Sequence, residues 1–110
     1  METWQIGDKE YQMALTAGSL LQIEKKTGLG FFELLGKMDN FSYLFAILWG
    51  ALQKHHSGLN EDDVADLFDE YMEKGGNLQS LLELLMQVLK EAGFAPVETA
   101  ATGKKATAKK

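Results

Sequence analysis

The chain has 110 residues, of which 45% are hydrophobic, and this suffices for one domain with its own core. It contains no cysteine, which excludes disulfides, thiol nucleophiles and cysteine zinc sites. Its eleven cations are all lysines and its net charge is −5, so the missing arginine and the acidic balance argue against nucleic acid as a partner.

The first fifteen residues alternate between apolar and polar side chains. The apolar positions that keep this period of two are Trp4, Ile6, Tyr11, Met13 and Leu15. A turn at residues 7–9 separates the two halves, so the pattern predicts a β-hairpin. Because an isolated hairpin is marginally stable, helices or another chain must cover its apolar face.

Three helices are predicted to follow the hairpin. Thr16 or Ser19 is a suitable cap for the first, which ends at Gly28. A short amphipathic helix follows over residues 31–38. The third helix covers residues 41–56 and is apolar nearly all round, which predicts a central core helix buried on most sides.

Two further helices complete the predicted body. Asn60 is positioned to cap the fourth helix, whose outer face is acidic and which ends at a Gly-Gly pair. Asn77 is positioned to cap the fifth, which extends to Ala92 and ends at Gly93. We therefore predict a mainly α (α+β) fold, in which an N-terminal β-hairpin precedes about five helices packed around a central apolar helix.

The domain boundary is expected near residue 96, with residues 1–96 forming a single helical domain that includes the hairpin. Residues 97–110 are rich in Ala, Thr and Lys with almost no apolar bulk, so we expect this tail to be disordered. Seven lysines and fifteen acids give residues 1–96 a net charge of −8. Four lysines and one acid give the tail a net charge of +3.

The leucine-rich stripe of the fifth predicted helix is wider than one core face requires. Either the helix is sandwiched within the domain, or part of the stripe is a partner surface. The candidate partner-binding residues are Leu78, Leu81, Leu82, Leu85, Met86 and Leu89. Self-association is an alternative use of the same stripe.

Catalytic and metal-binding motifs are missing from the sequence. His55 and His56 are adjacent and so cannot form the i, i+4 pair that binds zinc; their position favours interaction with a helix C-terminus. Residues 60–63 lack the spacing of a calcium loop. No phosphate-binding loop and no G-x-S-x-G is present. The sequence thus predicts a protein that is not an enzyme and has no catalytic residue, metal or cofactor.

The order of these elements resembles the tail assembly chaperones of long-tailed bacteriophages and prophages. The resemblance rests on the hairpin of residues 4–15, the glycine-stopped helix of residues 20–28 with its Ile-Glu pair, and the short helix of residues 31–38. It continues through the apolar helix of residues 44–52 and the acidic helix start at residues 59–64. The likeness covers roughly residues 3–92 and is one of pattern.

The resemblance implies a function in virion morphogenesis. Such chaperones are small, mostly helical proteins that bind and solubilise the tape measure protein while tube protein polymerises around it. Many also exist as a longer, frameshifted form whose added domain can recruit tail tube protein. The implied partners are therefore tape measure protein and tail tube protein. The implied location is the cytoplasm of the bacterial host, with no place in the mature virion.

Two alternatives remain from the sequence. One is a minor structural or adaptor protein of a phage tail. The other is a small acidic helical carrier protein, because Ser80 opens a leucine-rich helix, although Gln79 stands where acyl carrier proteins have an aspartate. The longest apolar run, residues 41–52, is interrupted by Ser42 and Gly50 and is shorter than the ~20 residues that cross a bilayer, so no membrane partner is expected.

Overall fold

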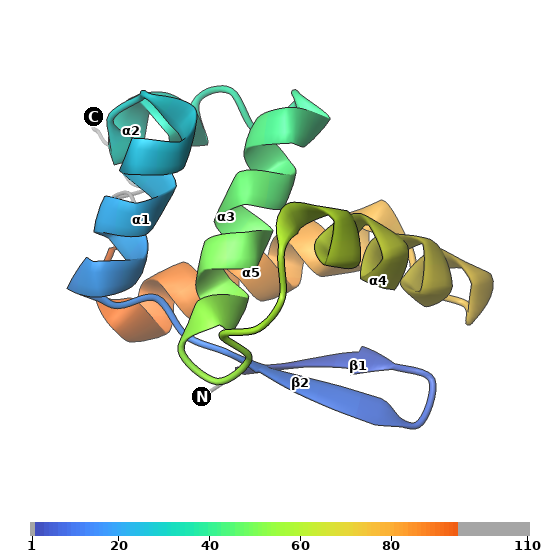
Figure 1. Ribbon diagram of the computed structural model, residues 1–110. Coiled ribbons are helices and arrows are strands. Elements are labelled where there is room, and N and C mark those ends of the chain that lie inside the picture. The colour runs from blue at the N-terminus through green and yellow to red at the C-terminus, as the bar shows by residue number, and fades with distance from the viewer. Residues whose placement is uncertain (1, 95–110) are drawn as a thin grey trace, which may run out of the picture.

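The computed structural model describes residues 2–94 and consists of one β-hairpin and five helices (Figure 1). The hairpin strands are β1 (Glu2–Ile6) and β2 (Lys9–Met13). The helices are α1 (Ala17–Thr27), α2 (Phe31–Leu35), α3 (Phe41–Gln53), α4 (Glu61–Glu73) and α5 (Leu78–Ala92). The prediction of a mainly helical α+β fold with an N-terminal hairpin and five helices is confirmed. The predicted tail of residues 97–110 lies outside the described residues.

The hairpin is antiparallel and buries one face. Trp4 pairs with Tyr11 and Glu2 with Met13, so the apolar side chains of both strands lie on the same side. Trp4, Ile6 and Met13 are fully buried. The loop is only two residues long, because Lys9 already belongs to β2, and Gly7 adopts φ 62°, a left-handed conformation that favours glycine.

The first two helices are defined by local signals. The Thr16 side chain accepts a hydrogen bond from the backbone N–H of Ser19, which decides between the two predicted caps of α1. Gly28 ends the helix in a left-handed conformation at φ 75°. The α2 helix ends at Leu35, three residues before the predicted end, and Glu24 joins the helices by accepting a hydrogen bond from the N–H of Phe31 at 2.8 Å.

The central helix is α3. None of its residues from 43 to 53 is exposed. It contacts α1, α4 and β2. The helix ends at Gln53, so the predicted extent to residue 56 is too long by three residues, although the backbone N–H of His56 still bonds to the carbonyl of Leu52 at 2.8 Å.

The last two helices are capped as predicted. Asn60 and Asp63 form a reciprocal capping box at the start of α4, with both hydrogen bonds at 2.9 Å. Asn77 caps α5 by accepting a hydrogen bond from Ser80 N–H at 2.8 Å. Gly93 ends α5 at φ 81°.

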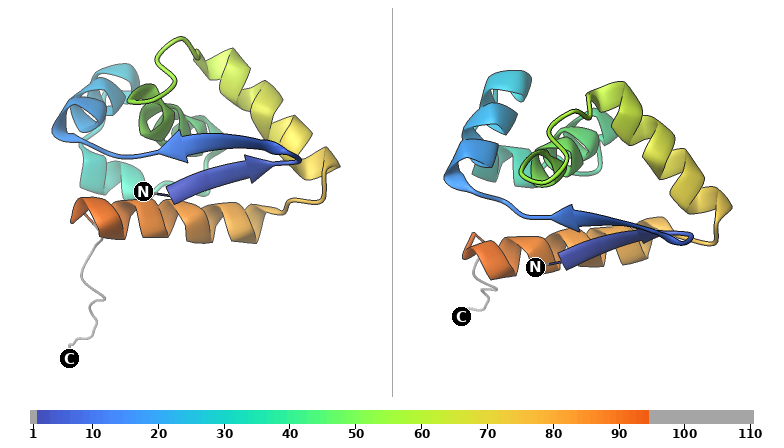
Figure 2. Two further views of the ribbon diagram at one scale, coloured as in Figure 1. Left: turned by 90° about the horizontal axis from the view of Figure 1, so that it is seen from below. Right: turned by 60° about the horizontal axis from the view of Figure 1, so that its bottom comes forward.

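The hairpin lies below α3 and contacts both α4 and α5. Figure 1 shows α3 in the middle, with α1 and α2 on one side, α4 on the other and α5 behind. In both views of Figure 2 the hairpin lies along α5, and β1 contacts both α5 and α4. The Trp4 ring meets Tyr71 of α4 edge-on at a centroid distance of 5.5 Å. This layer closes the core on the side that α1 and α2 leave open.

Close approach of α1 to α3 depends on Gly50. A Cβ atom placed on Gly50 would collide with Cδ1 and Cγ1 of Ile23. Ile23 is itself fully buried, so it has no free space into which it could move. Gly50 therefore sets the distance between the two helices.

We expect Gly50→Val to lower the free energy of unfolding by about 2–3 kcal/mol, because the added atoms overpack the contact with Ile23. Urea denaturation monitored by circular dichroism measures this change. Gly58→Val is the matched control, since a Cβ there has no atom within 4 Å. Equal stabilities for the two variants would contradict the proposed packing role of Gly50.

Candidate functional site

The six candidate partner-binding residues of α5 separate into two groups. Leu81, Leu85 and Leu89 have no exposed surface and belong to the hydrophobic core. A partner therefore cannot reach these three side chains in the folded domain, where they pack inward as the sandwiched alternative expects. The neighbours that cover them include the hairpin, because α5 contacts β1.

The other three candidates lie on the flank of α5. Leu78, Leu82 and Met86 are spaced i, i+4 and i+8, so they form one row along the helix. Leu78 and Leu82 are half-buried, and Met86 is 41% exposed. A partner can reach this row without unfolding of the domain, so its role in binding stays a prediction.

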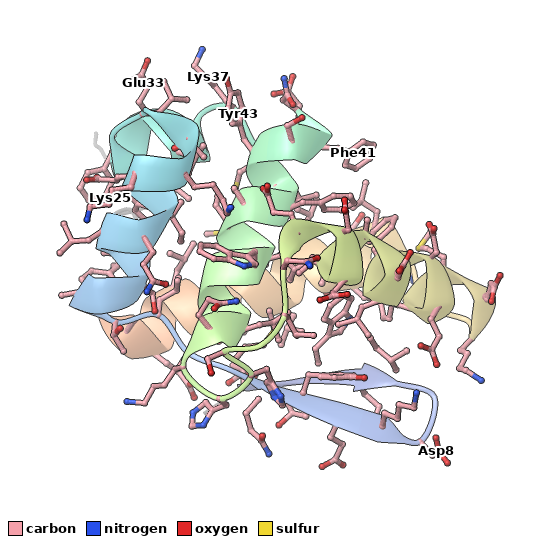
Figure 3. The ribbon with its side chains drawn as sticks, viewed as in Figure 1. Asp8, Lys25, Glu33, Lys37, Phe41 and Tyr43 are labelled. Carbon is pink, nitrogen blue, oxygen red and sulfur yellow. The ribbon has the colours of Figure 1, made fainter. Side chains whose placement is uncertain are left out.

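An apolar groove lies between the start of α3 and the start of α5. Its volume is about 390 Å³. We call it the α3–α5 groove. It is lined by Met38, Asp39, Phe41, Leu44, Leu78 and Leu82. Figure 3 shows Phe41 projecting from the first turn of α3 on the side where α4 lies. Phe41 is 51% exposed.

Three phenylalanines continue the apolar surface from the groove toward α4. The rings of Phe41 and Phe45 have centroids 5.8 Å apart. Phe68 of α4 lies 6.2 Å from Phe41 and 5.2 Å from Phe45. These distances are typical of stabilising aromatic contacts, so Phe41 is held in place on one side and open on the other.

Helix caps position the two ends of the groove. The Asn40 side chain accepts a hydrogen bond from Ser42 N–H at 3.0 Å, which fixes the first turn of α3 and therefore Phe41. Asn77 fixes the first turn of α5 and therefore Leu78 in the same way. Both caps can be recognised in the sequence, whereas the proximity of the two helix starts cannot be predicted from it.

Sequence reasoning missed Met38, Phe41 and Phe68 as members of this surface. Their periodicity assigns them to core faces, and Phe68 is indeed half-buried. A usable signal was the position of Phe41 directly after the cap Asn40, because the first turn of a helix often extends beyond the elements that cover it. The acidic residue Asp39 beside it was a second signal of a surface position.

His56 has a role different from the expected interaction with a helix C-terminus. It follows the end of α3, and its Nε2 accepts a hydrogen bond from the backbone N–H of Gln12 at 3.1 Å. Its ring also packs edge-on against Tyr11 at 5.3 Å. Partial burial, and to a lesser degree the neighbouring His55, lowers the pKa of His56 below its ordinary value of 6.5. The neutral imidazole is therefore the form that joins the hairpin to the end of α3.

The described part of the chain contains little else that suggests chemistry. Across residues 2–94, no three His, Cys, Asp or Glu side chains are arranged to hold a metal ion. A second pocket of about 220 Å³ lies between the start of α1 and the end of α3. Polar side chains dominate its lining, which consists of Thr16, Gly18, Ser19, Gln22, Gln53 and Lys54. None of the described helices has both the length and the apolar character to span a bilayer.

Comparisons with known proteins give no further guide to the site. No protein-family model matches the chain. No curated protein and no solved structure matches it either.

We expect the free energy of unfolding to be lower at pH 5.5 than at pH 7.5, with His56 contributing to the difference. Because its folded-state pKa lies below 6.5, the unfolded chain binds the proton more strongly. Stability therefore falls as pH drops through 6.5 and levels off below the folded pKa. His56→Gln should reduce this pH dependence in urea titrations. His55→Gln should leave most of it in place, because burial is the larger cause of the lowered pKa of His56. An unchanged pH dependence in His56→Gln would refute the assignment.

Proposed function

We propose that this protein is a non-enzymatic phage tail assembly chaperone that binds and solubilises the tape measure protein during tail morphogenesis. The observation that carries the proposal is the α3–α5 groove, an apolar surface open to solvent at the ends of two capped helices. Such a surface suits the binding of an amphipathic helix by its apolar face. The resemblance of element order to tail assembly chaperones supplies the identity of the partner.

The groove supports transient binding more than permanent assembly. Phe41 is about half exposed, so the free protein keeps this part of the groove in water without unfolding. A few hundred Å² of exposed apolar surface is tolerated by soluble monomers and commonly marks a binding site. Methionine side chains adapt to different contact shapes, which suits a chaperone that binds successive segments of one long chain.

The proposal extends to location and to a second partner. The protein acts in the cytoplasm of the bacterial host and is released before the virion is complete. A longer form recruits tail tube protein to the chaperone-bound tape measure. The minor structural or adaptor alternative differs in one observable respect, since a structural component is present in purified virions and a chaperone is not. Mass spectrometry of purified particles separates the two functions.

We expect Phe41→Ser to weaken binding of the tape measure protein encoded by the same genome by about tenfold, because it removes an exposed aromatic side chain that the bound partner would bury. Co-expression followed by measurement of the soluble tape measure fraction, and titration of the purified proteins, tests this. Leu21→Ser is the matched control, because Leu21 is 61% exposed on α1 and does not line the groove. A tape measure protein that is equally soluble without this protein would refute the proposed function.

A further inference from the structure

Four carboxylates form a row along the exposed side of α4. Asp62, Asp66, Asp69 and Glu73 are spaced i, i+4, i+7 and i+11, which places them on one helix face, and all four are exposed. We call this row the acidic stripe. Among residues 2–94, none of these four side chains pairs with a lysine. Like charges at i, i+4 destabilise a helix, so the row carries a small folding cost.

The other acidic residues of α4 already have structural partners. Asp63 belongs to the capping box. Glu61 lies 3.6 Å from Lys26 of α1, and Glu70 lies 3.7 Å from Lys9 of β2. Within the described residues the acidic stripe has no lysine partner, and only Asp62, in the first turn of α4, interacts favourably with the helix dipole.

The acidic stripe borders the apolar surface that begins at the α3–α5 groove. The ring of Phe68 in α4 contacts the ring of Phe41 in α3. Met72, one turn after Phe68, is 42% exposed. At about 100° per residue, Met72 lies roughly 40° from Phe68 and roughly 60° from Asp69 around the helix. A path across the surface thus passes from Phe41 over Phe68 and Met72 to the carboxylates.

A further carboxylate lies at the groove itself. Asp39 lines the groove next to Phe41. The nearest lysine in sequence, Lys37, projects away from Phe41 beyond the end of α2 (Figure 3). The groove therefore has a carboxylate in its own lining in addition to those of the acidic stripe.

We infer that this surface binds an amphipathic helix with a cationic flank. The apolar side chains of that helix enter the α3–α5 groove, and its lysine or arginine side chains lie over the acidic stripe. This inference rests on the proposed function and specifies the chemistry of the bound segment. Charge complementarity adds orientation and a faster encounter to the apolar contact.

Two other occupants fit the surface less well. A second copy carries the same carboxylates beside its own groove, so it offers no cationic flank to pair with the acidic stripe. The tail of this chain, residues 97–110, offers four lysines but Val97 as its only large apolar side chain. It cannot fill a groove of about 390 Å³ with apolar contacts.

Three synthetic helical peptides that share one leucine face test the inference. Their polar positions carry lysine, glutamine or glutamate, so only the charge of the flank differs. We expect the lysine peptide to bind most tightly by isothermal titration calorimetry, and the glutamate peptide least. We expect the preference for lysine to shrink as NaCl rises from about 50 mM to about 500 mM, because exposed charges are screened within several ångströms at the higher salt.

Two double variants test whether the preference for the lysine peptide depends on the acidic stripe. Asp66→Asn with Asp69→Asn should weaken the lysine peptide about fivefold and leave the glutamine peptide unchanged, at the usual strength of exposed ion pairs. Asp8→Asn with Glu10→Gln makes the same change in net charge on the hairpin, whose Asp8 lies far from Phe41 in Figure 3. This control should change neither the affinity for the lysine peptide nor that for the glutamine peptide. All four positions are exposed, so both variants are expected to fold, and circular dichroism verifies this.

The outcomes that overturn the inference are distinct from failure of the proposed function. Equal binding of the lysine and glutamine peptides, or an equal effect of both variant pairs, would show that the bound helix needs no cationic flank. Neither result would contradict an apolar chaperone groove. Amide shifts confined to the hairpin or α1 on peptide addition also overturn the inference, as does dimerisation of the free protein that is abolished by Phe41→Ser. If no peptide binds while tape measure protein is still kept soluble, this inference fails and the chaperone function stands.

Discussion

The burial of α3 on nearly every side is the constraint on which the rest of the structure depends. No residue between positions 43 and 53 is exposed, so a single neighbouring element could not cover this helix. Contacts from α1, α4 and β2 each take one side, and Gly50 allows α1 to approach the backbone itself. Because each large apolar side chain contributes about 1.5–3 kcal/mol on burial, removal of any covering element would expose much of the stabilising surface. The hairpin belongs to this cover, which explains how two short strands persist without a larger sheet.

The α3–α5 groove arises where that cover ends. Leu44 is fully buried, whereas Phe41, one helical turn earlier, keeps half of its surface in water. The cap at Asn40 holds this turn rigid, so the exposed ring is presented in a fixed position. An apolar surface at the end of a well-packed helix combines accessibility with little loss of conformational entropy on binding. The proposed binding surface is in this sense a continuation of the core beyond its last covering layer.

The charges of α4 divide between folding and surface roles. Asp63 caps the helix, while Glu61 and Glu70 reach lysines of α1 and β2. These contacts are local and exposed, so each contributes about 1 kcal/mol or less. Within the described residues the acidic stripe makes no comparable contact with a lysine, and it lies beside the apolar surface. Its position beside the apolar surface, more than its charge alone, is what supports the proposed cationic partner.

Local signals in the sequence determined the elements and most of their ends. Caps at Thr16, Asn60 and Asn77 and stops at Gly28 and Gly93 act within one helical turn, so they can be recognised without knowledge of the neighbours. The period of two in the hairpin and the all-round apolar pattern of α3 likewise predicted the faces that are buried.

The tertiary structure alone decided which flank of α5 is covered, that the starts of α3 and α5 meet, and that His56 accepts a hydrogen bond from β2. The physical reason is that periodicity reports how wide an apolar face is. Which part of that face stays open depends on contacts between residues far apart in the chain.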